Sequence, residues 1–294
     1  PQDTEISQWA YAVYGDVWHS FGTGSNWKVS RPLIDYLREY NDPRLSKYAK
    51  PATGGTVELN KGNLGKEERY DKYVNFFVDL LDSSDVNYQF TNHGDTIAEI
   101  SIPENTNYIG QPVRMSPDIY PFVKNEFFSE PADIVINPKG SKEIFPEIVL
   151  STADAYFMRA KAAAMGITDE NAASLYEQGI RHAMSLWDVS ASKIDGYIAN
   201  SEFGSIAGDS QEDQIRKISI QRWIASYTDG FEAWSVVRKS GYPECLANGV
   251  DDSEIYGFGD LANGVYPQRL RYGTGVFDTN PQNAQDAIDE QGPD

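Results

Sequence analysis

QIRKISIQRWIASYTDGFEAWSVVRKSGYP, residues 214–243, predicts two helices joined by a tight turn. In the first helix, apolar side chains recur at intervals of three or four residues and therefore share one face: Ile220, Trp223, Ile224 and Tyr227. Ile215 and Ile218 fall on other faces of the same helix. This distribution predicts a helix that is packed on two sides and lies deep in the structure.

The turn and the second helix carry their own signals. Asp229 is expected to cap the second helix, with Glu232 as the reciprocal partner in a capping box. The apolar face of this helix is predicted to consist of Phe231, Trp234 and Val237. Gly241, followed closely by a proline, is a typical C-terminal stop.

Composition limits the classes of function. The chain has 294 residues, of which 40% are hydrophobic and 13% aromatic, enough to build a substantial core. Its formal charge of −19 disfavours binding to nucleic acid and to anionic lipid through a basic patch. Sugars, cationic ligands and metal ions remain open as ligands. The single cysteine, Cys245, excludes an internal disulfide.

Apolar periodicity predicts further helices at residues 30–41, 43–49, 146–166, 168–187 and 193–199. Residues 50–142 are predicted to be largely irregular, with short strands at 97–102 and 133–136, because glycine and proline interrupt the apolar runs. From residue 244 onward, we expect a loop-rich segment that ends in an acidic tail at 282–294.

Catalytic and nucleotide-binding signatures are missing from the sequence, including G-x-S-x-G, H-E-x-x-H, the P-loop and the EF-hand loop. No cofactor is therefore predicted. Acidic runs at 79–85 and 251–254 leave a calcium site open, although such runs are more often solvated surface. A carboxylate pair for glycoside hydrolysis also stays open, since 44 acidic residues guarantee some close pairs.

Aromatic residues concentrate in the first 28 positions, within a segment rich in glycine and serine. Flat rings suit the apolar faces of pyranose sugars, and neighbouring amides and hydroxyls can bind sugar hydroxyls. The predicted ligand-binding residues are therefore Trp9, Tyr14, Trp18, Asn26 and Trp27. The alternative is that these rings pack in the core, which is the more common fate of any single ring. Trp187, Trp223 and Trp234 lie on amphipathic stripes and are predicted to be core residues.

Six short blocks follow one another along the chain. They are residues 30–37 with DPRL at 42–45 and YAKP at 48–51, DAYFMRAKA at 154–162, LYEQGI at 175–180, QRWIA at 221–225, GFEAW at 230–234 with GYP at 241–243, and PQRLRY at 267–272. In this order the blocks resemble the SusD/RagB family of nutrient-binding outer-membrane lipoproteins. Lys161, Gly273 and Val276 depart from the family pattern.

The resemblance implies a mainly α-helical fold, with tetratricopeptide-like helix pairs and a large loop-rich portion. It implies that residues 1–294 form a single SusD-like domain, as a fragment without the lipidated N-terminus and the N-terminal helical repeats. The ligand residues of the family form no motif, so none is carried over.

The function that the resemblance implies is non-catalytic. The full-length protein would be lipid-anchored at the outer membrane, on the cell surface. There it would bind a glycan or other nutrient and pass it to a SusC-like TonB-dependent porin. A carbohydrate-active hydrolase and a helical-repeat protein–protein scaffold are the alternatives.

Overall fold

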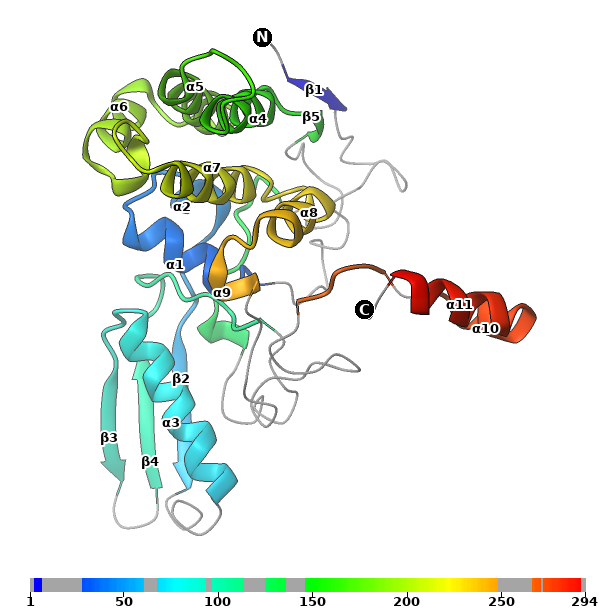
Figure 1. Ribbon diagram of the computed structural model, residues 1–294. Coiled ribbons are helices and arrows are strands. Elements are labelled where there is room, and N and C mark those ends of the chain that lie inside the picture. Colours follow the sequence, from blue (N-terminus) through cyan, green and yellow to red (C-terminus); the bar gives the residue numbers. More distant parts are fainter. Residues whose placement is uncertain are drawn as a thin grey trace.

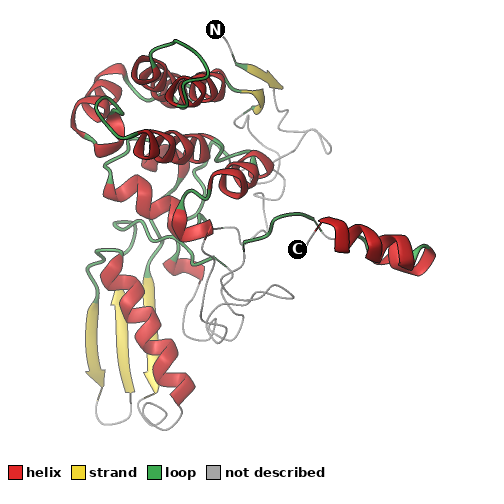
Figure 2. Cartoon of the chain, in the orientation of Figure 1, coloured by secondary structure: helices red, strands yellow, loops and turns green. Residues whose placement is uncertain are grey.

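The computed structural model describes residues 3–6, 28–60, 68–93, 97–113, 125–135, 146–247, 266–270 and 272–291. These residues are mainly helical, as expected, with few strands (Figures 1 and 2). A body of packed helices lies at one end of the molecule, and a small unit of one helix and three strands lies at the other (Figure 1). Within the described ranges, no helix is both long and apolar enough to cross a membrane.

The helical body consists of α1 (Arg31–Glu39), α2 (Leu45–Tyr48), α4 (Thr152–Ala164), α5 (Ala172–Ser185), α6 (Ala191–Asn200), α7 (Gln211–Ala225) and α8 (Gly230–Ser240). α4 and α5 form one helical hairpin and α7 and α8 form a second, and α7 also packs on α4 (Figure 1). The apolar faces of these helices enclose one continuous core. Trp187 and Trp223 lie in it, as predicted, whereas Trp234 is only half-buried.

Helix α7 is packed on more than one side, which confirms the prediction from its sequence. Every residue from Lys217 to Gln221 is buried, so its middle turn has no solvent-exposed face. The helix begins three residues earlier than the quoted stretch because Ser210 caps it, accepting a hydrogen bond from the backbone N–H of Asp213 at 3.1 Å.

Helix α8 confirms its predicted ends but not its predicted apolar face. The Asp229 carboxylate accepts a hydrogen bond from the Glu232 backbone N–H at 2.9 Å, and Gly241 adopts a left-handed φ of 76°. Phe231, however, is 74% exposed, whereas Val236 and Val237 are buried. At about 100° per residue, position 231 lies about 140° and 120° around the helix from those two valines, which explains its exposure.

The predicted capping box is incomplete. The carboxylate of Glu232 pairs with the Arg222 guanidinium at 2.6 Å, and that guanidinium also binds Asp154 of α4 at 2.6 Å. Arg222 of α7 therefore links α4 and α8 to its own helix. The Glu232 carboxylate is engaged in this ion pair and does not accept the predicted capping hydrogen bond from the Asp229 N–H.

The prediction that residues 50–142 are largely irregular is wrong for much of the described part. β2 (Gly55–Asn60), β4 (Ile97–Ile102) and β3 (Gln89–His93) form an antiparallel sheet in that order, beside the helix α3 (Glu68–Ser83) (Figure 1). A second core joins them and includes Val57, Phe77, Leu80, Leu81, Ile100 and Phe127. The strand predicted at 97–102 is confirmed, whereas residues 133–135 form a turn and no strand.

The chain leaves the helical body and returns to it at neighbouring points. The backbone N–H of Lys50 donates to the carbonyl of Glu130 at 2.8 Å, and that of Ala132 donates to the carbonyl of Tyr48 at 2.9 Å. The guanidinium of Arg38 donates to the carbonyls of Ser83 and Ser84 at 3.0 and 2.9 Å, which ties the end of α3 to α1. The unit of β2, α3, β3 and β4 is thus an excursion fastened at its base.

Two further boundaries differ from the sequence prediction. Residues Glu147–Leu150 form β5, which pairs with β1 (Thr4–Ile6), so α4 begins at Thr152 and not near Pro146. Ser151 caps α4 by accepting a hydrogen bond from the Asp154 N–H at 3.3 Å.

The expected loop-rich end of the chain also contains helices: α9 (Glu244–Ala247), α10 (Thr274–Thr279) and α11 (Pro281–Gln291). Pairs of side chains four residues apart support α11, since Gln282 donates to Asp286 at 2.7 Å and Gln285 donates to Asp289 at 2.9 Å.

Candidate functional site

The predicted ligand-binding residues lie outside the described residues: Trp9, Tyr14, Trp18, Asn26 and Trp27. Their role therefore stays a prediction. The structure does define where the chain enters and leaves this segment. On the N-terminal side, β1 pairs with β5, and on the C-terminal side, residues 28–30 lead into α1.

The C-terminal end of the aromatic segment is held firmly. The ammonium of Lys28 lies 2.8 Å from the Glu130 carboxylate, and the Lys28 side chain is only 6% exposed. The next residue, Val29, donates to the carbonyl of Ser129 and accepts from the N–H of Gln111, both at 2.9 Å. Hydrogen bonding to Lys28, together with Lys50, holds the pKa of Glu130 below its usual value. Trp27 is therefore adjacent in sequence to a fixed point of the fold.

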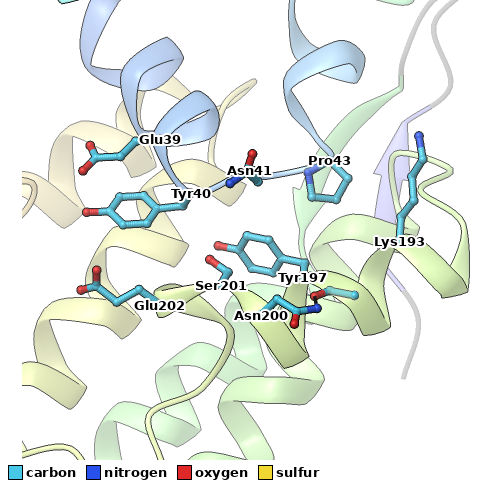
Figure 3. A pocket seen from close by; sticks show the side chains of 10 residues that line it. Glu39, Tyr40, Asn41, Pro43, Lys193, Tyr197, Asn200, Ser201 and Glu202 are labelled. Atoms are coloured by element: carbon cyan, nitrogen blue, oxygen red, sulfur yellow. Dashed lines mark hydrogen bonds between the residues drawn. The ribbon is translucent and has the colours of Figure 1, made fainter.

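A pocket of about 720 Å³ opens between the C-terminal ends of α1 and α6 (Figure 3). It is lined by Glu39, Tyr40, Asn41, Pro43, Lys193, Gly196, Tyr197, Asn200, Ser201 and Glu202. Helix α1 ends here because Asn41 adopts a positive φ of 52° and the residue before a proline avoids the α conformation. The two helix ends thereby bring tyrosine rings, amides and carboxylates to one hollow.

A buried polar network fixes Tyr197 at the base of this pocket. The Gln221 amide N–H donates to the Tyr197 hydroxyl at 2.8 Å, and the Gln221 amide oxygen accepts from Arg44 at 2.7 Å. Arg44 is fully buried and pairs with Asp42 at 2.5 Å. Burial, and then the Asp42 carboxylate, raise the pKa of Tyr197 well above its ordinary value, so the hydroxyl stays protonated at neutral pH.

Tyr40 is the second ring of the pocket. Its centroid lies 4.5 Å from that of Phe203 and 5.8 Å from that of Tyr36, so neighbouring rings support one side of it. Burial raises the pKa of Tyr40, and the carboxylates of Glu39 and Glu202 raise it further. Figure 3 shows the Tyr40 ring between these two carboxylates, with Tyr197 beyond it.

The chemistry available in this pocket is that of binding. Its rings offer apolar faces, and the amides of Asn41 and Asn200 and the hydroxyl of Ser201 offer both hydrogen-bond donors and acceptors. Neither histidine nor cysteine is among the lining residues. Across the described ranges, no group of three or more histidine, cysteine, aspartate or glutamate side chains is placed to hold a metal ion.

The two acidic runs considered for calcium have different outcomes. Residues 79–85 belong to the end of α3 and the turn after it, where no such group forms among the described side chains, and residues 251–254 lie outside the described ranges. The pocket itself was not predicted, because Tyr40 and Tyr197 are distant in sequence. The only local signal was the helix stop before Pro43.

Comparison with known proteins identifies the family. Residues 2–273 match a SusD-like family model described as starch-binding and associating with the outer membrane. No curated protein sequence matches the chain significantly. A SusD homologue from Bacteroides fragilis is similar in structure, with a TM-score of 0.64, 20% identity, and coverage of 98% of this chain and 54% of that one.

Two other solved structures show the same fold. A chitin-binding protein has a TM-score of 0.57 and 22% identity, with 90% of this chain and 47% of that one covered. A SusD homologue from Parabacteroides distasonis has a TM-score of 0.55 and 17% identity, with coverage of 99% and 55%. The chain thus spans about half the length of these structures. Since the family model covers nearly the whole chain, the protein belongs to the SusD-like family, which is described as starch-binding and associating with the outer membrane.

Proposed function

We propose that the chain is part of a lipid-anchored cell-surface protein that captures a glycan or other nutrient and delivers it to a SusC-like TonB-dependent transporter. The observation that carries this proposal is the family match over residues 2–273. The name of the chitin-binding relative makes glycans the first ligand class to test.

The aromatic segment is the proposed primary ligand site, with Trp9, Tyr14, Trp18, Asn26 and Trp27 as its ligand-binding residues. Two observations support it. The ring chemistry suits sugars, and the structure holds both ends of the segment through β1 and through the contacts of Lys28 and Val29.

Calorimetric titration of the full-length protein against a panel of neutral oligosaccharides tests the ligand class. Trp18→Ala and Trp27→Ala are expected to weaken binding at least tenfold while leaving the melting temperature nearly unchanged. Trp223→Ala is the matched control, because its ring is in the core and its loss lowers stability. A large fall in melting temperature for the first two variants would identify their rings as core residues.

Delivery to a transporter requires a complex. Affinity purification of the full-length protein from membranes is expected to co-purify a large TonB-dependent β-barrel. Release of reducing sugar from the same panel, abolished by substitution of a single carboxylate, would overturn the non-catalytic assignment. Recovery of the β-barrel without binding of any glycan would instead favour a scaffold role.

A further inference from the structure

Negative charge accumulates at one end of the pocket between α1 and α6. Glu39 and Glu202 are exposed and both line it. Two helices also end here, α1 at Glu39 and α6 at Asn200, and a helix C-terminus carries a partial negative charge of roughly half an electron. The negative electrostatic potentials of the two carboxylates and the two helix C-termini therefore add at this end of the pocket.

The nearby arginines are engaged elsewhere. Arg31 and Arg38 of α1 pair with Asp35 at 3.3 and 3.1 Å. Arg216, which lies over the ring of Phe203, pairs with Glu244 at 3.0 Å. The charge of Arg216 also reaches the Tyr40 hydroxyl and offsets part of the effect of Glu39 and Glu202, whose combined action still raises the pKa of that hydroxyl.

The hydroxyl end of the Tyr40 ring lies within this negative field, close to the Glu39 carboxylate. Figure 3 places the Tyr40 ring between the carboxylates of Glu39 and Glu202. A tyrosine ring attracts a cation, and the two carboxylates add a favourable Coulomb interaction. An organic ammonium group matches all three of these side chains at once, whereas an anion is repelled.

The rest of the pocket is suited to hydroxyl groups and not to a second cation. Asn41, Asn200 and Ser201 lie between the Tyr40 end and Lys193, whose ammonium is at the opposite end of the pocket (Figure 3). Lys193 repels positive charge there. The volume of about 720 Å³ is within the range of small-molecule sites and exceeds the need of one sugar ring.

We propose that this pocket is a second binding site, which takes a hydroxylated organic ammonium such as an amino sugar. Its ammonium lies on Tyr40 between Glu39 and Glu202, and its hydroxyls extend towards Asn200 and Ser201. The site is built from residues other than the aromatic segment, so it goes beyond the function proposed above and does not depend on it.

The test compares the glucosamine disaccharide with its N,N′-diacetylated form by calorimetry on the full-length protein at pH 6, where the free amines are protonated. The two ligands share their rings and hydroxyls and differ in charge. The free amine is expected to bind at least tenfold more tightly and to lose affinity at high salt. Equal or tighter binding of the acetylated form would refute an ammonium site.

Single-charge variants locate the site. Glu39→Gln and Glu202→Gln are each expected to weaken binding of the glucosamine disaccharide three- to tenfold, and Lys193→Gln to tighten it two- to threefold. Glu212→Gln, which removes the same charge from an exposed position in the first turn of α7, is the matched control and should change nothing. If all three glutamate variants bind alike, the proposal is wrong.

The outcome is separable from that of the primary site. Trp18→Ala and Trp27→Ala should leave binding of the glucosamine disaccharide unchanged. Neutral glycan binding without amine binding would overturn the second site alone, and the reverse result would overturn only the aromatic segment as the primary site for neutral glycans.

Discussion

Replacement of Gly179 by alanine is expected to destabilise the protein, against the ordinary preference for alanine in a helix. Gly179 lies in the middle of α5, where alanine normally adds about 1 kcal/mol of stability. A Cβ at this position would lie 2.5, 2.6 and 2.9 Å from three ring carbons of Phe157 on α4. That ring is fully buried, so it has little room to move.

The magnitude follows from these two opposing effects. Forcing a methyl group into a packed core costs about 1–3 kcal/mol, and contacts as short as these correspond to the upper part of that range. After subtraction of the helix preference, we expect a net loss of about 1–2 kcal/mol in the free energy of unfolding. Gly196→Ala in α6 is the matched control, because a Cβ at that position would have no atom within 4 Å and the variant should gain about 0.5–1 kcal/mol.

Urea denaturation followed by circular dichroism measures both variants on the same protein. Because the helix preference is common to both, the difference between them isolates the packing cost. In a protein that already carries Phe157→Leu, Gly179→Ala should cost less free energy of unfolding than it does in the original protein, as expected for two residues in contact. Equal shifts in the two glycine variants, or a more stable Gly179→Ala protein, would refute the close approach of α4 and α5.

Three further predictions concern other parts of the chain. Trp223→Ala should cost about 3–5 kcal/mol in urea denaturation, because the ring is 7% exposed within the main core. Lys28 and Lys50 lower the pKa of Glu130 in the folded protein, so the contribution of this carboxylate to stability should be complete above about pH 4.3 and be lost as pH falls through the lowered pKa. Glu130→Gln should therefore reduce stability at pH 7 but much less at pH 3. An equal loss at both pH values would contradict the ion pairs. Partial burial, and then Glu244, raise the pKa of Cys245 to about 11, although the residue reaches the surface; alkylation at pH 8 should therefore be slower than for a free cysteine, and comparable rates would exclude that environment.

The α7–α8 hairpin could be predicted because its signals are local. Asp229 and Gly241 act on backbone groups within a few residues, and the apolar residues of α7 repeat with the helical period. The exposure of Phe231 could not be read in this way, since it depends on which side of α8 meets its neighbours. Sequence spacing gives the faces of a helix but does not say which face is covered.

Helix α3 and its sheet were missed for a related reason. Phe77, Leu80 and Leu81 have helical spacing, but they lie in a stretch crowded with charged residues and surrounded by turn signals. Their burial depends on strands that pair across distant positions, such as Val57 with Ile100. Tertiary packing decided the structure of this region over its local propensity.

The pocket was beyond sequence reasoning because it depends on a buried contact between distant residues. Tyr197 is oriented by Gln221, and Gln221 by Arg44, which lies 177 positions earlier. Taken singly in the sequence, none of these residues indicates a binding site. Only the folded arrangement brings two helix ends and two tyrosine rings together.

The fastened base of the excursion between Lys50 and Glu130 has a consequence for chain entropy. Its two ends are neighbours in the helical body, joined by a backbone hydrogen bond of 2.8 Å. By the logarithmic dependence of closure entropy on length, replacing these roughly 80 residues by a turn of about four would lower the cost of closure by about 2.7 kcal/mol. The segment between Lys50 and Glu130 is thus a suitable position for deletion or grafting, because it can be replaced without changing the path of the chain through the helical body.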